Sequence, residues 1–289
     1  MNMLRMGTRG SPLALAQSGM VAAQVRARTG VDVQLVVIRT RGDDVVDRPL
    51  AAVGGKGLFT KEIELALLAG EVDFAVHSLK DLPTIQPEGL TLAATPPRED
   101  PRDVLIGGRL AELKLGAVVG TGSQRRQAQL LAARPDLVVR DIRGNVDTRI
   151  RKLQAGEFDA IVLAAAGVIR LGRAAEITER LSVDAMVPAP GQGALALQCR
   201  VGDAAAAGAL LALHDADAAL EVEAERAWLD AAGGGCTVPT ACYVQVDSAG
   251  ATLRGFHLRP DGVRRRVEER VARADVVARA RALGAEAAG

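Results

Sequence analysis

The sequence is poor in aromatic residues and in net charge, and each shortage argues against a class of protein. Phe, Trp and Tyr make up 2% of the 289 residues, which leaves few rings on which nucleic-acid bases could stack. The formal net charge is +1, so no overall field draws the chain to nucleic acid or to an anionic membrane. Any anion site must therefore be built from local clusters of basic residues.

Cysteine and histidine are also scarce, with three of each. Their spacing matches no metal-binding pattern such as CxxC or HxxxH, so we expect no metal site. The apolar stretch PLALAQSGMVAA is interrupted by Gln17 and Ser18, which predicts an amphipathic helix rather than a signal peptide. No run is long enough to span a membrane. We therefore expect a cytoplasmic protein whose cysteines stay reduced.

Short apolar segments alternate with helical ones through most of the chain. LRMGTR, VDVQLVVIRT and DFAVHS are typical of buried strands, and helices are predicted to begin at Ser11 and near Phe59. The alternation restarts after PPREDPR at residues 96–102. This pattern predicts an α/β fold with two lobes, each built on a mainly parallel sheet covered by helices.

The boundaries between domains are indicated by changes of composition. Residues 188–200, PAPGQGALALQCR, are rich in Pro and Gly and are predicted to cross between the lobes and lead into a strand. From about Asp215 a long helix, alternating strands and a final Ala/Arg-rich helix predict a small α+β unit. We expect domain 1 at residues 1–96 and 194–213, domain 2 at 97–193, domain 3 at 214–289, and a ligand cleft between the two lobes.

Basic residues gather at the predicted turns from strand to helix. Helix starts have free N–H groups and a partial positive charge, so arginines there are best explained by an anion bound among them. The planar fork of arginine matches carboxylate and phosphate geometry. The alternative is that each arginine is a solvated surface charge. The polar residues at or near these turns are Arg9, Ser11, Thr121, Ser123, Arg125, Arg126, Arg143, Arg149, Arg151, Arg170 and Arg173.

One carboxylate lies where a strand is predicted to end. Asp81 stands in AVHSLKDLP, next to Lys80 and before Pro83. An aspartate in this position can stabilise a cation or move a proton, or it can simply cap a turn. His77 has no evident partner in the sequence and is interpreted as a residue that packs or forms hydrogen bonds locally.

Cys236 differs from the other two cysteines because it follows three glycines and precedes Pro239. Its thiol is expected to be accessible, able to ionise or to carry a covalent group. Cys199 and Cys242 lie in strand-like segments and are predicted to be small core residues. GGKGLF, at residues 54–59, lacks the full spacing of a phosphate-binding loop. It is interpreted as a mobile glycine-rich loop over the cleft.

Taken in order from about residue 7 to 243, nine segments resemble the motifs of the porphobilinogen deaminase family, also called hydroxymethylbilane synthases. The segments are TRGSPLALAQ, VGGKGLFTKEIE, DFAVHSLKDLPT, REDPRDVL, GTGSQRRQAQL, RGNVDTRIRKL, AAAGVIRLG, PAPGQGALALQCR and GCTVP. The resemblance implies two lobes similar to those of periplasmic binding proteins and a small third α+β domain.

The resemblance also implies an activity. Members are transferases of tetrapyrrole biosynthesis, the route to heme, chlorophyll and cobalamin. They join four porphobilinogen molecules head to tail with release of ammonia, and then hydrolyse off the linear tetrapyrrole. The chain grows on a dipyrromethane primer that a thioether links to one cysteine. With porphobilinogen as the partner, we expect a monomer that binds neither nucleic acid nor membrane.

The family's functional residues carry over to named positions. Cys236 is implied as the attachment residue. Asp81 is implied as the catalytic aspartate, which would stabilise a cationic azafulvene-like species and the pyrrole N–H groups. The positions implied for the cofactor are Lys80, Thr121, Ser123, Arg125 and Arg126. Those implied for the substrate and its acetate and propionate groups are Arg9, Ser11, Lys56, Phe59, Arg143, Arg149 and Arg170.

Three positions depart from the family pattern: Ala52 stands where lysine is common, Gln198 where an acidic residue is frequent, and Ala241 where glycine is common. None of them is a proposed catalytic or attachment residue, so activity is expected. Two other classes of protein suit the sequence less well. A binding protein for a small anion would suit the two lobes but gives no reason for Cys236. A nucleic-acid-binding protein could use the arginines for phosphates, but the low net charge and few aromatic residues argue against it.

Overall fold

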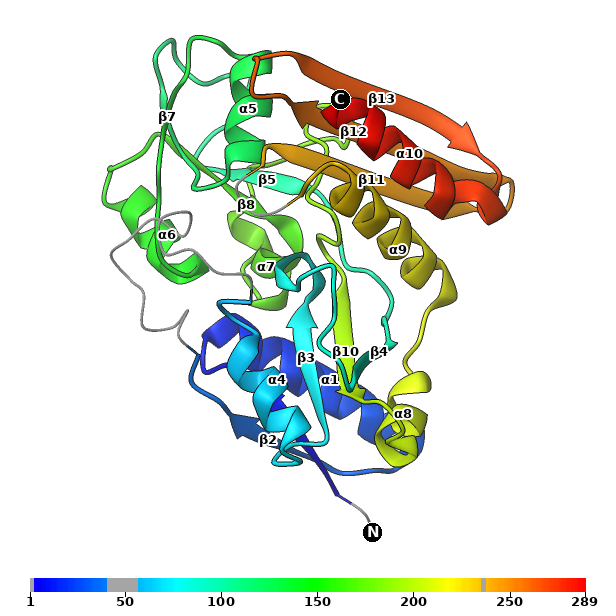
Figure 1. Cartoon of the computed structure of the whole chain (residues 1–289). Helices are drawn as coiled ribbons and strands as arrows, with labels where there is room; N and C mark the ends of the chain where they lie inside the picture. Colours follow the sequence, from blue (N-terminus) through cyan, green and yellow to red (C-terminus); the bar gives the residue numbers. More distant parts are fainter. Residues whose placement is uncertain (1–2, 41–56, 235–237) are drawn as a thin grey trace. The chain divides into compact units, whose positions relative to one another are not determined.

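The computed structural model describes residues 3–40, 57–234 and 238–289 (Figure 1). The chain is divided into two compact units. Unit 1 comprises Met1–Glu99 and Ala194–Ala219, and unit 2 comprises Asp100–Gly193 and Leu220–Gly289. Unit 2 thus contains the sequence of the predicted second lobe and most of the predicted C-terminal domain. The division into three domains stays a prediction.

Unit 1 is built on a five-stranded sheet with the order β2-β1-β3-β10-β4. The strands are β2 (Val33–Val37), β1 (Leu4–Thr8), β3 (Phe74–Ser78), β10 (Leu195–Arg200) and β4 (Leu90–Ala94). β1 runs parallel to β2 and β3, whereas β10 runs antiparallel to both β3 and β4. The prediction of a mainly parallel sheet is therefore confirmed: β2, β1, β3 and β4 run in one direction, and β10, which comes from a distant part of the chain, is inserted in the other.

Helices cover both faces of this sheet. Alternate residues of each strand point to opposite faces. On one face α1 (Pro12–Thr29) and α8 (Ala204–Leu211) pack on side chains such as those of Phe74 and Cys199. On the other face α4 (Lys61–Leu68) packs on Ala75 and its neighbours. A one-turn helix, η1 (Leu79–Asp81), follows β3 directly.

Unit 2 contains a second five-stranded sheet, with the order β7-β6-β8-β5-β9. The strands are β7 (Val138–Arg140), β6 (Val118–Gly120), β8 (Ala160–Ala164), β5 (Asp103–Ile106) and β9 (Glu179–Arg180). β6 runs parallel to β7 and β8, but β5 is antiparallel to β8 and β9. Because β9 then runs in the same direction as β8, four of the five strands share one direction, and the expectation of a mainly parallel sheet is confirmed here as well.

The helices of this part of unit 2 again lie on both faces of the sheet. α5 (Gln124–Ala133) contributes Leu130 to the core on one face. α6 (Val146–Gln154) and α7 (Ala165–Arg170) contribute Ile150 and Val168 to the core on the other. A short turn, η2 (Ala174–Glu176), follows α7.

The C-terminal part of unit 2 is a three-stranded antiparallel sheet with helices on one face. β11 (Thr240–Asp247), β12 (Gly250–Leu258) and β13 (Arg264–Val271) pair in sequence order. The helices are α9 (Ala216–Ala231), whose first residues belong to unit 1, and α10 (Val276–Ala288), which follows η3 (Arg273–Asp275). The predicted fold class is confirmed: two α/β lobes and a small α+β part.

The core of this C-terminal part is organised around the one tryptophan of the chain. Trp228 on α9 is fully buried with Cys242, Leu253 and residues of α10. Gly255 on β12 faces the indole, and a Cβ atom there would lie 2.3 Å from it. A glycine is therefore required at this contact.

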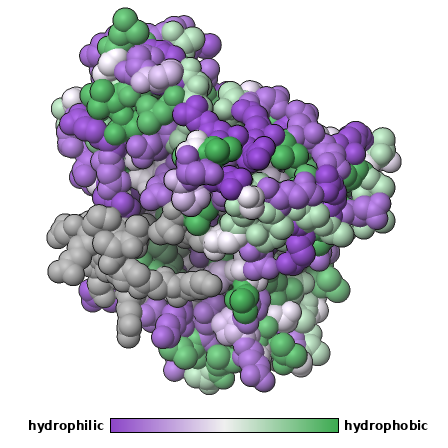
Figure 2. Space-filling model, turned by 45° about the horizontal axis from the view of Figure 1, so that its top comes forward, coloured by the Kyte–Doolittle hydropathy of each residue, from purple (hydrophilic) through white to green (hydrophobic). Residues whose placement is uncertain are grey.

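The face shown in Figure 2 is mostly hydrophilic, with small hydrophobic patches that are separated from one another. Over residues 3–40, 57–234 and 238–289, no helix is both long and apolar enough to cross a bilayer. Cys199 and Cys242 are completely buried, which confirms their prediction as core residues. Lys56, Cys236 and the departure at Ala52 lie outside the described residues.

Candidate functional site

A pocket in unit 1 lies where β1 and β3 end. Because these two strands are parallel neighbours, their carboxyl ends meet at one edge of the sheet. Arg9 and Ser11 follow β1, and Ser78 and Asp81 follow from β3. All four line the pocket, together with Phe59 and Thr60 next to the start of α4.

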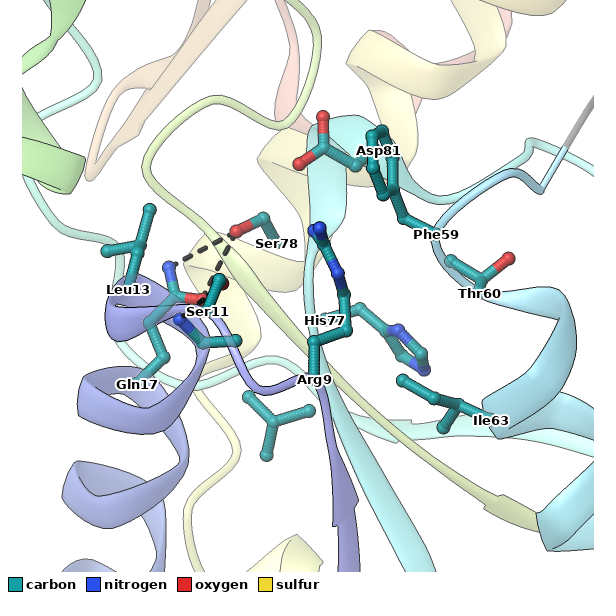
Figure 3. Close-up of a pocket in the computed structure, with 12 residues that line it drawn as sticks. Arg9, Ser11, Leu13, Gln17, Phe59, Thr60, Ile63, His77, Ser78 and Asp81 are labelled. Atoms are coloured by element: carbon teal, nitrogen blue, oxygen red, sulfur yellow. Dashed lines mark hydrogen bonds between the residues drawn. The ribbon is translucent and has the colours of Figure 1, made fainter. Parts of the chain in front are cut away.

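The charged and aromatic side chains of this pocket point toward one another (Figure 3). The guanidinium of Arg9 lies 4.2 Å from the centre of the Phe59 ring, a cation–π contact. Asp81 projects from η1 and is exposed to solvent. The predicted grouping of Arg9, Ser11, Phe59 and Asp81 is thus found in the structure, with Lys80 beside Asp81 in the same turn.

The wall of the pocket contains further polar residues whose hydrogen-bond partners the sequence did not indicate. Gln17 donates to the Ser78 hydroxyl at 3.1 Å. His77 is buried, and its Nε2 lies 3.0 Å from Oε1 of Gln198 on β10. Burial lowers the pKa of His77 to about 4, although its hydrogen bond to Gln198 acts in the opposite direction. His77 is therefore neutral near pH 7, and its partner lies far away in the sequence.

In unit 2 a buried carboxylate holds two of the predicted arginines. Asp103 accepts hydrogen bonds from Nη1 of Arg125 at 2.7 Å and from Nε and Nη2 of Arg126 at 3.0 and 2.8 Å. Both arginine side chains are almost fully buried and Asp103 is completely so. Burial alone would raise the pKa of Asp103, but the two positive charges hold it well below its usual range. The anion among these arginines is thus an internal aspartate.

Two further predicted arginines lie near this pair. Arg149 is half-buried and donates to the carbonyl of Gly144 at 2.8 Å, and Arg143 pairs with Asp141 at 2.6 Å. Burial lowers the pKa of Arg149 to about 10, and the positive charges of Arg126 and Arg143 act in the same direction. Like charges thus accumulate here, and an anionic ligand would relieve the repulsion between them.

The remaining predicted residues of these turns have local structural roles. Ser11 and Ser123 are N-cap residues whose hydroxyls accept from Ala14 N and Arg126 N. The Thr121 hydroxyl accepts from Ser123 N at 3.2 Å. Arg170, in the last turn of α7, donates to the carbonyl of Gly193 at 2.7 Å. Their predicted contacts with cofactor and substrate stay predictions.

Several residues of the site were missed at the level of sequence. Asp103 had a recognisable signal, since an acidic residue opens the otherwise apolar strand DVLI. Gln17 and Thr60 had none, because their positions in the pocket wall depend on how the helices pack against β3. Gln198 was indicated only as a departure from the family pattern, and its contact with His77 depends on the pairing of β10 with β3. Among the described residues, no three His, Cys, Asp or Glu side chains are grouped so that they could hold a metal ion.

The fold and these two clusters define a class of protein. An α/β protein with an Arg/Asp pocket in one unit and an excess of positive charge in the other is suited to small molecules that bear several carboxylates. Two family models then cover nearly the whole chain. "Porphobilinogen deaminase, dipyromethane cofactor binding domain" matches residues 4–208, and "Porphobilinogen deaminase, C-terminal domain" matches residues 219–289. The chain belongs to the porphobilinogen deaminase family.

Individual relatives agree with this assignment. Porphobilinogen deaminase of Trichlorobacter lovleyi is 54% identical over 262 residues, which is 90% of this chain and 84% of the relative. The enzyme of Geobacter sulfurreducens is 52% identical over 267 residues, 91% of this chain and 84% of the relative. Among solved structures, the methionine-binding protein MetQ has a TM-score of 0.47 at 12% identity, covering 75% of this chain and 91% of its own.

Membership settles the activity and cofactor that the motifs implied. The chain is a transferase of tetrapyrrole biosynthesis, a hydroxymethylbilane synthase that acts on porphobilinogen. Its first matched region is the dipyrromethane-binding domain of the family.

Proposed function

We propose that Asp81 is the catalytic carboxylate of this hydroxymethylbilane synthase and that Cys236 carries the dipyrromethane primer. The observation that supports the first role is the pocket that Asp81 shares with Arg9. Porphobilinogen bears two carboxylates and one aminomethyl group, so it needs a positive and a negative partner close together. Arg9 and Asp81 are such a pair.

The arginines of unit 2 suit the carboxylates of the primer and of the growing chain. Each pyrrole brings one acetate and one propionate. Burial lowers the pKa of Arg149, and repulsion from Arg126 and Arg143 lowers it further; this repulsion would fall when a carboxylate binds beside it. When bound, the primer supplies the terminal pyrrole carbon to which the first substrate is joined. We propose that Lys80, Thr121, Ser123, Arg125 and Arg126 contact it.

The substrate is held by a second proposed set: Arg9, Ser11, Lys56, Phe59, Arg143, Arg149 and Arg170. In each condensation the C–N bond of the aminomethyl group breaks and ammonia departs with the bonding electrons. A C–C bond then forms and the attacked pyrrole carbon loses its proton. Asp81 would stabilise the cation that the departing ammonia leaves, and its carboxylate is suited to hydrogen-bond the pyrrole N–H groups.

The physical state of the protein is part of the proposal. We propose a cytoplasmic monomer that binds neither nucleic acid nor membrane. The near-zero net charge and the low aromatic content support this view. Size-exclusion chromatography with light scattering tests the monomer, and a complex with DNA that dissociates with salt would contradict the rest.

The roles of Asp81 and Cys236 are tested by separate variants. Asp81→Asn keeps the shape of the side chain and removes its charge, so we expect it to retain the primer and lose at least about a hundredfold in turnover. Cys236→Ala is expected to lack the mass of two pyrrole units in intact-mass spectrometry. The matched control is Cys199→Ala, because Cys199 is completely buried, and it should keep both the adduct and the turnover.

Two results would contradict these roles. Near-normal turnover of Asp81→Asn would remove Asp81 from catalysis. A wild-type protein that is fully active without any adduct, or an adduct that persists in Cys236→Ala, would remove Cys236 as the attachment residue.

A further inference from the structure

A buried amide lies behind the Asp81 pocket, on the face of the unit 1 sheet that α4 covers. Gln198 on β10 is completely buried. The register of β10 and β3 pairs Gln198 with Ala75 and Ala196 with His77, so the side chains of Gln198 and His77 are diagonal neighbours on one face. The amide of Gln198 therefore lies directly behind the wall of the pocket to which His77 belongs.

Gln198 forms hydrogen bonds with His77 and with Gln86, one through its oxygen and the other through its nitrogen. Its Oε1 lies 3.0 Å from Nε2 of His77, and its Nε2 donates to Oε1 of Gln86 at 2.8 Å. Because the amide nitrogen is directed to Gln86, the oxygen faces His77 and accepts from it. This network assigns the proton of His77 to Nε2.

These two partners lie on either side of the turn that carries Asp81. His77 is in β3, just before η1, and Gln86 is in the segment that follows η1. Gln86 also donates to the carbonyl of Pro83 at 3.1 Å, two residues after Asp81. One side chain from a distant strand thus fixes both ends of the turn, while Asp81 itself is exposed.

The surroundings explain why an amide is suited to this position. Glu64 on α4 is buried, and its Oε1 has no hydrogen-bond partner among the described residues. Burial raises the pKa of Glu64, and a hydrogen bond with Gln198 opposes this only in part. A carboxylate at position 198 would place a second negative charge beside Glu64. It would also lose the N–H that Gln86 accepts.

We propose that Gln198 is a positioning residue for the condensation reaction: it holds the Asp81 turn through Gln86 and fixes the Nε2–H and the ring of His77 behind the pocket. This inference rests on the proposed catalytic role of Asp81. The charged groups around His77 are Arg9 after β1 and Asp81 in η1, which line the same pocket, and Glu64 on α4, which forms a hydrogen bond with the same amide.

The first test removes the two hydrogen bonds. Gln198→Met keeps the length of the side chain, and we expect kcat to fall about tenfold to a hundredfold, with KM changed less than about twofold. Gln86→Met, in a half-buried segment, should lower kcat by a smaller factor. The double variant should be no worse than Gln198→Met, because both substitutions break one network. All three should keep the primer in intact-mass spectrometry.

Cys199→Ala is the matched control for lost stability. Cys199 is the next residue of the same strand, and its side chain is buried on the opposite face. We expect it to lower the unfolding midpoint without lowering kcat. If Gln198→Met does not fold, Gln86→Met carries the test.

The second test is a pH profile. In the wild type His77 is neutral above about pH 5, because its pKa is about 4. Gln198→Glu places a carboxylate beside Nε2, which raises the pKa of His77, so kcat should gain an ionisation between about pH 5 and 8. Unchanged kcat in Gln198→Met, an equal loss in Cys199→Ala, or a wild-type pH profile for Gln198→Glu would each overturn the inference. If Asp81→Asn also keeps its turnover, the proposed function fails as well.

Discussion

Replacing Asp103 with Asn should destabilise unit 2 strongly, because it removes the one negative charge that two buried arginines share. Asp103 accepts four hydrogen bonds, from Arg125, twice from Arg126, and from Gln192. Asn has a single acceptor oxygen, so part of this set becomes donor facing donor. Two guanidinium groups would then be left buried without a counter-charge.

The expected loss is about 3–5 kcal/mol of unfolding free energy, which is typical when one partner of a buried ion pair is removed. Urea denaturation followed by tryptophan fluorescence measures this loss of stability in unit 2, the unit that contains Asp103. Trp228 is the one tryptophan of the chain and is buried in unit 2. Its emission should shift as this unit unfolds.

Asp136→Asn is the matched control. Asp136 makes a bidentate pair with Arg134, with both distances at 2.7 Å, but the two side chains are 27% and 20% exposed. Exposed pairs contribute about 1 kcal/mol or less. Asp136→Asn thus removes the charge of an arginine-bound aspartate whose pair is more exposed and involves one arginine instead of two. A loss below about 1 kcal/mol for Asp103→Asn, or equal losses for both variants, would refute the reasoning.

The stability that Asp103 contributes through its contacts with Arg125 and Arg126 depends on pH. The pKa of Asp103 is lower in the folded protein than in the unfolded chain, so its contribution is fully present above the unfolded pKa, about 4. It is lost as the pH falls below that value. The difference in stability between wild type and Asp103→Asn should be constant from about pH 8 to pH 5 and shrink below about pH 4.

Three further variants test other parts of the structure. Arg149→Met removes a cation that its neighbours repel, so the urea midpoint should stay the same or rise while turnover falls about tenfold or more. Phe59→Leu removes the ring that contacts the Arg9 guanidinium. The loss of a cation–π contact of about 0.5–1 kcal/mol should raise KM about two- to fivefold. Gly255→Ala forces a methyl group against Trp228 and should cost about 1–3 kcal/mol in the same denaturation experiment. A result opposite in sign would contradict the contact concerned.

Local signals predicted a large part of the fold. The Ser11-Pro12 pair marks the start of α1, and the restart of the alternation after residue 102 marks the second sheet. The direction of β10 was not predictable in this way. A strand that returns from a distant part of the chain has the same apolar pattern in either direction, so the sequence predicted the mainly parallel sheet but not the antiparallel insertion of β10 into it.

The functional site, like the fold, was predicted from local sequence signals only in part. Turn positions were enough to group Arg9 with Asp81, because parallel strands bring their carboxyl ends together. The partner of a charge was harder to predict. Two arginines in the first turn of α5 pointed to an anion, and the nearest one is a carboxylate of the protein itself.

The two outcomes for these arginines follow from one physical rule. A buried cation needs a counter-charge, and where the fold supplies it, as Asp103 does for Arg125 and Arg126, the arginine is held firmly in place. Where the fold supplies less, as at Arg149, the pKa falls and the site favours an external anion. Asp103 therefore lets the protein keep the fixed positive charge of Arg126 near Arg149, and this charge, with that of Arg143, makes Arg149 the member of the cluster that gains most from a bound carboxylate. Asp103→Asn should consequently weaken carboxylate binding as well as stability, whereas Arg149→Met should weaken binding alone.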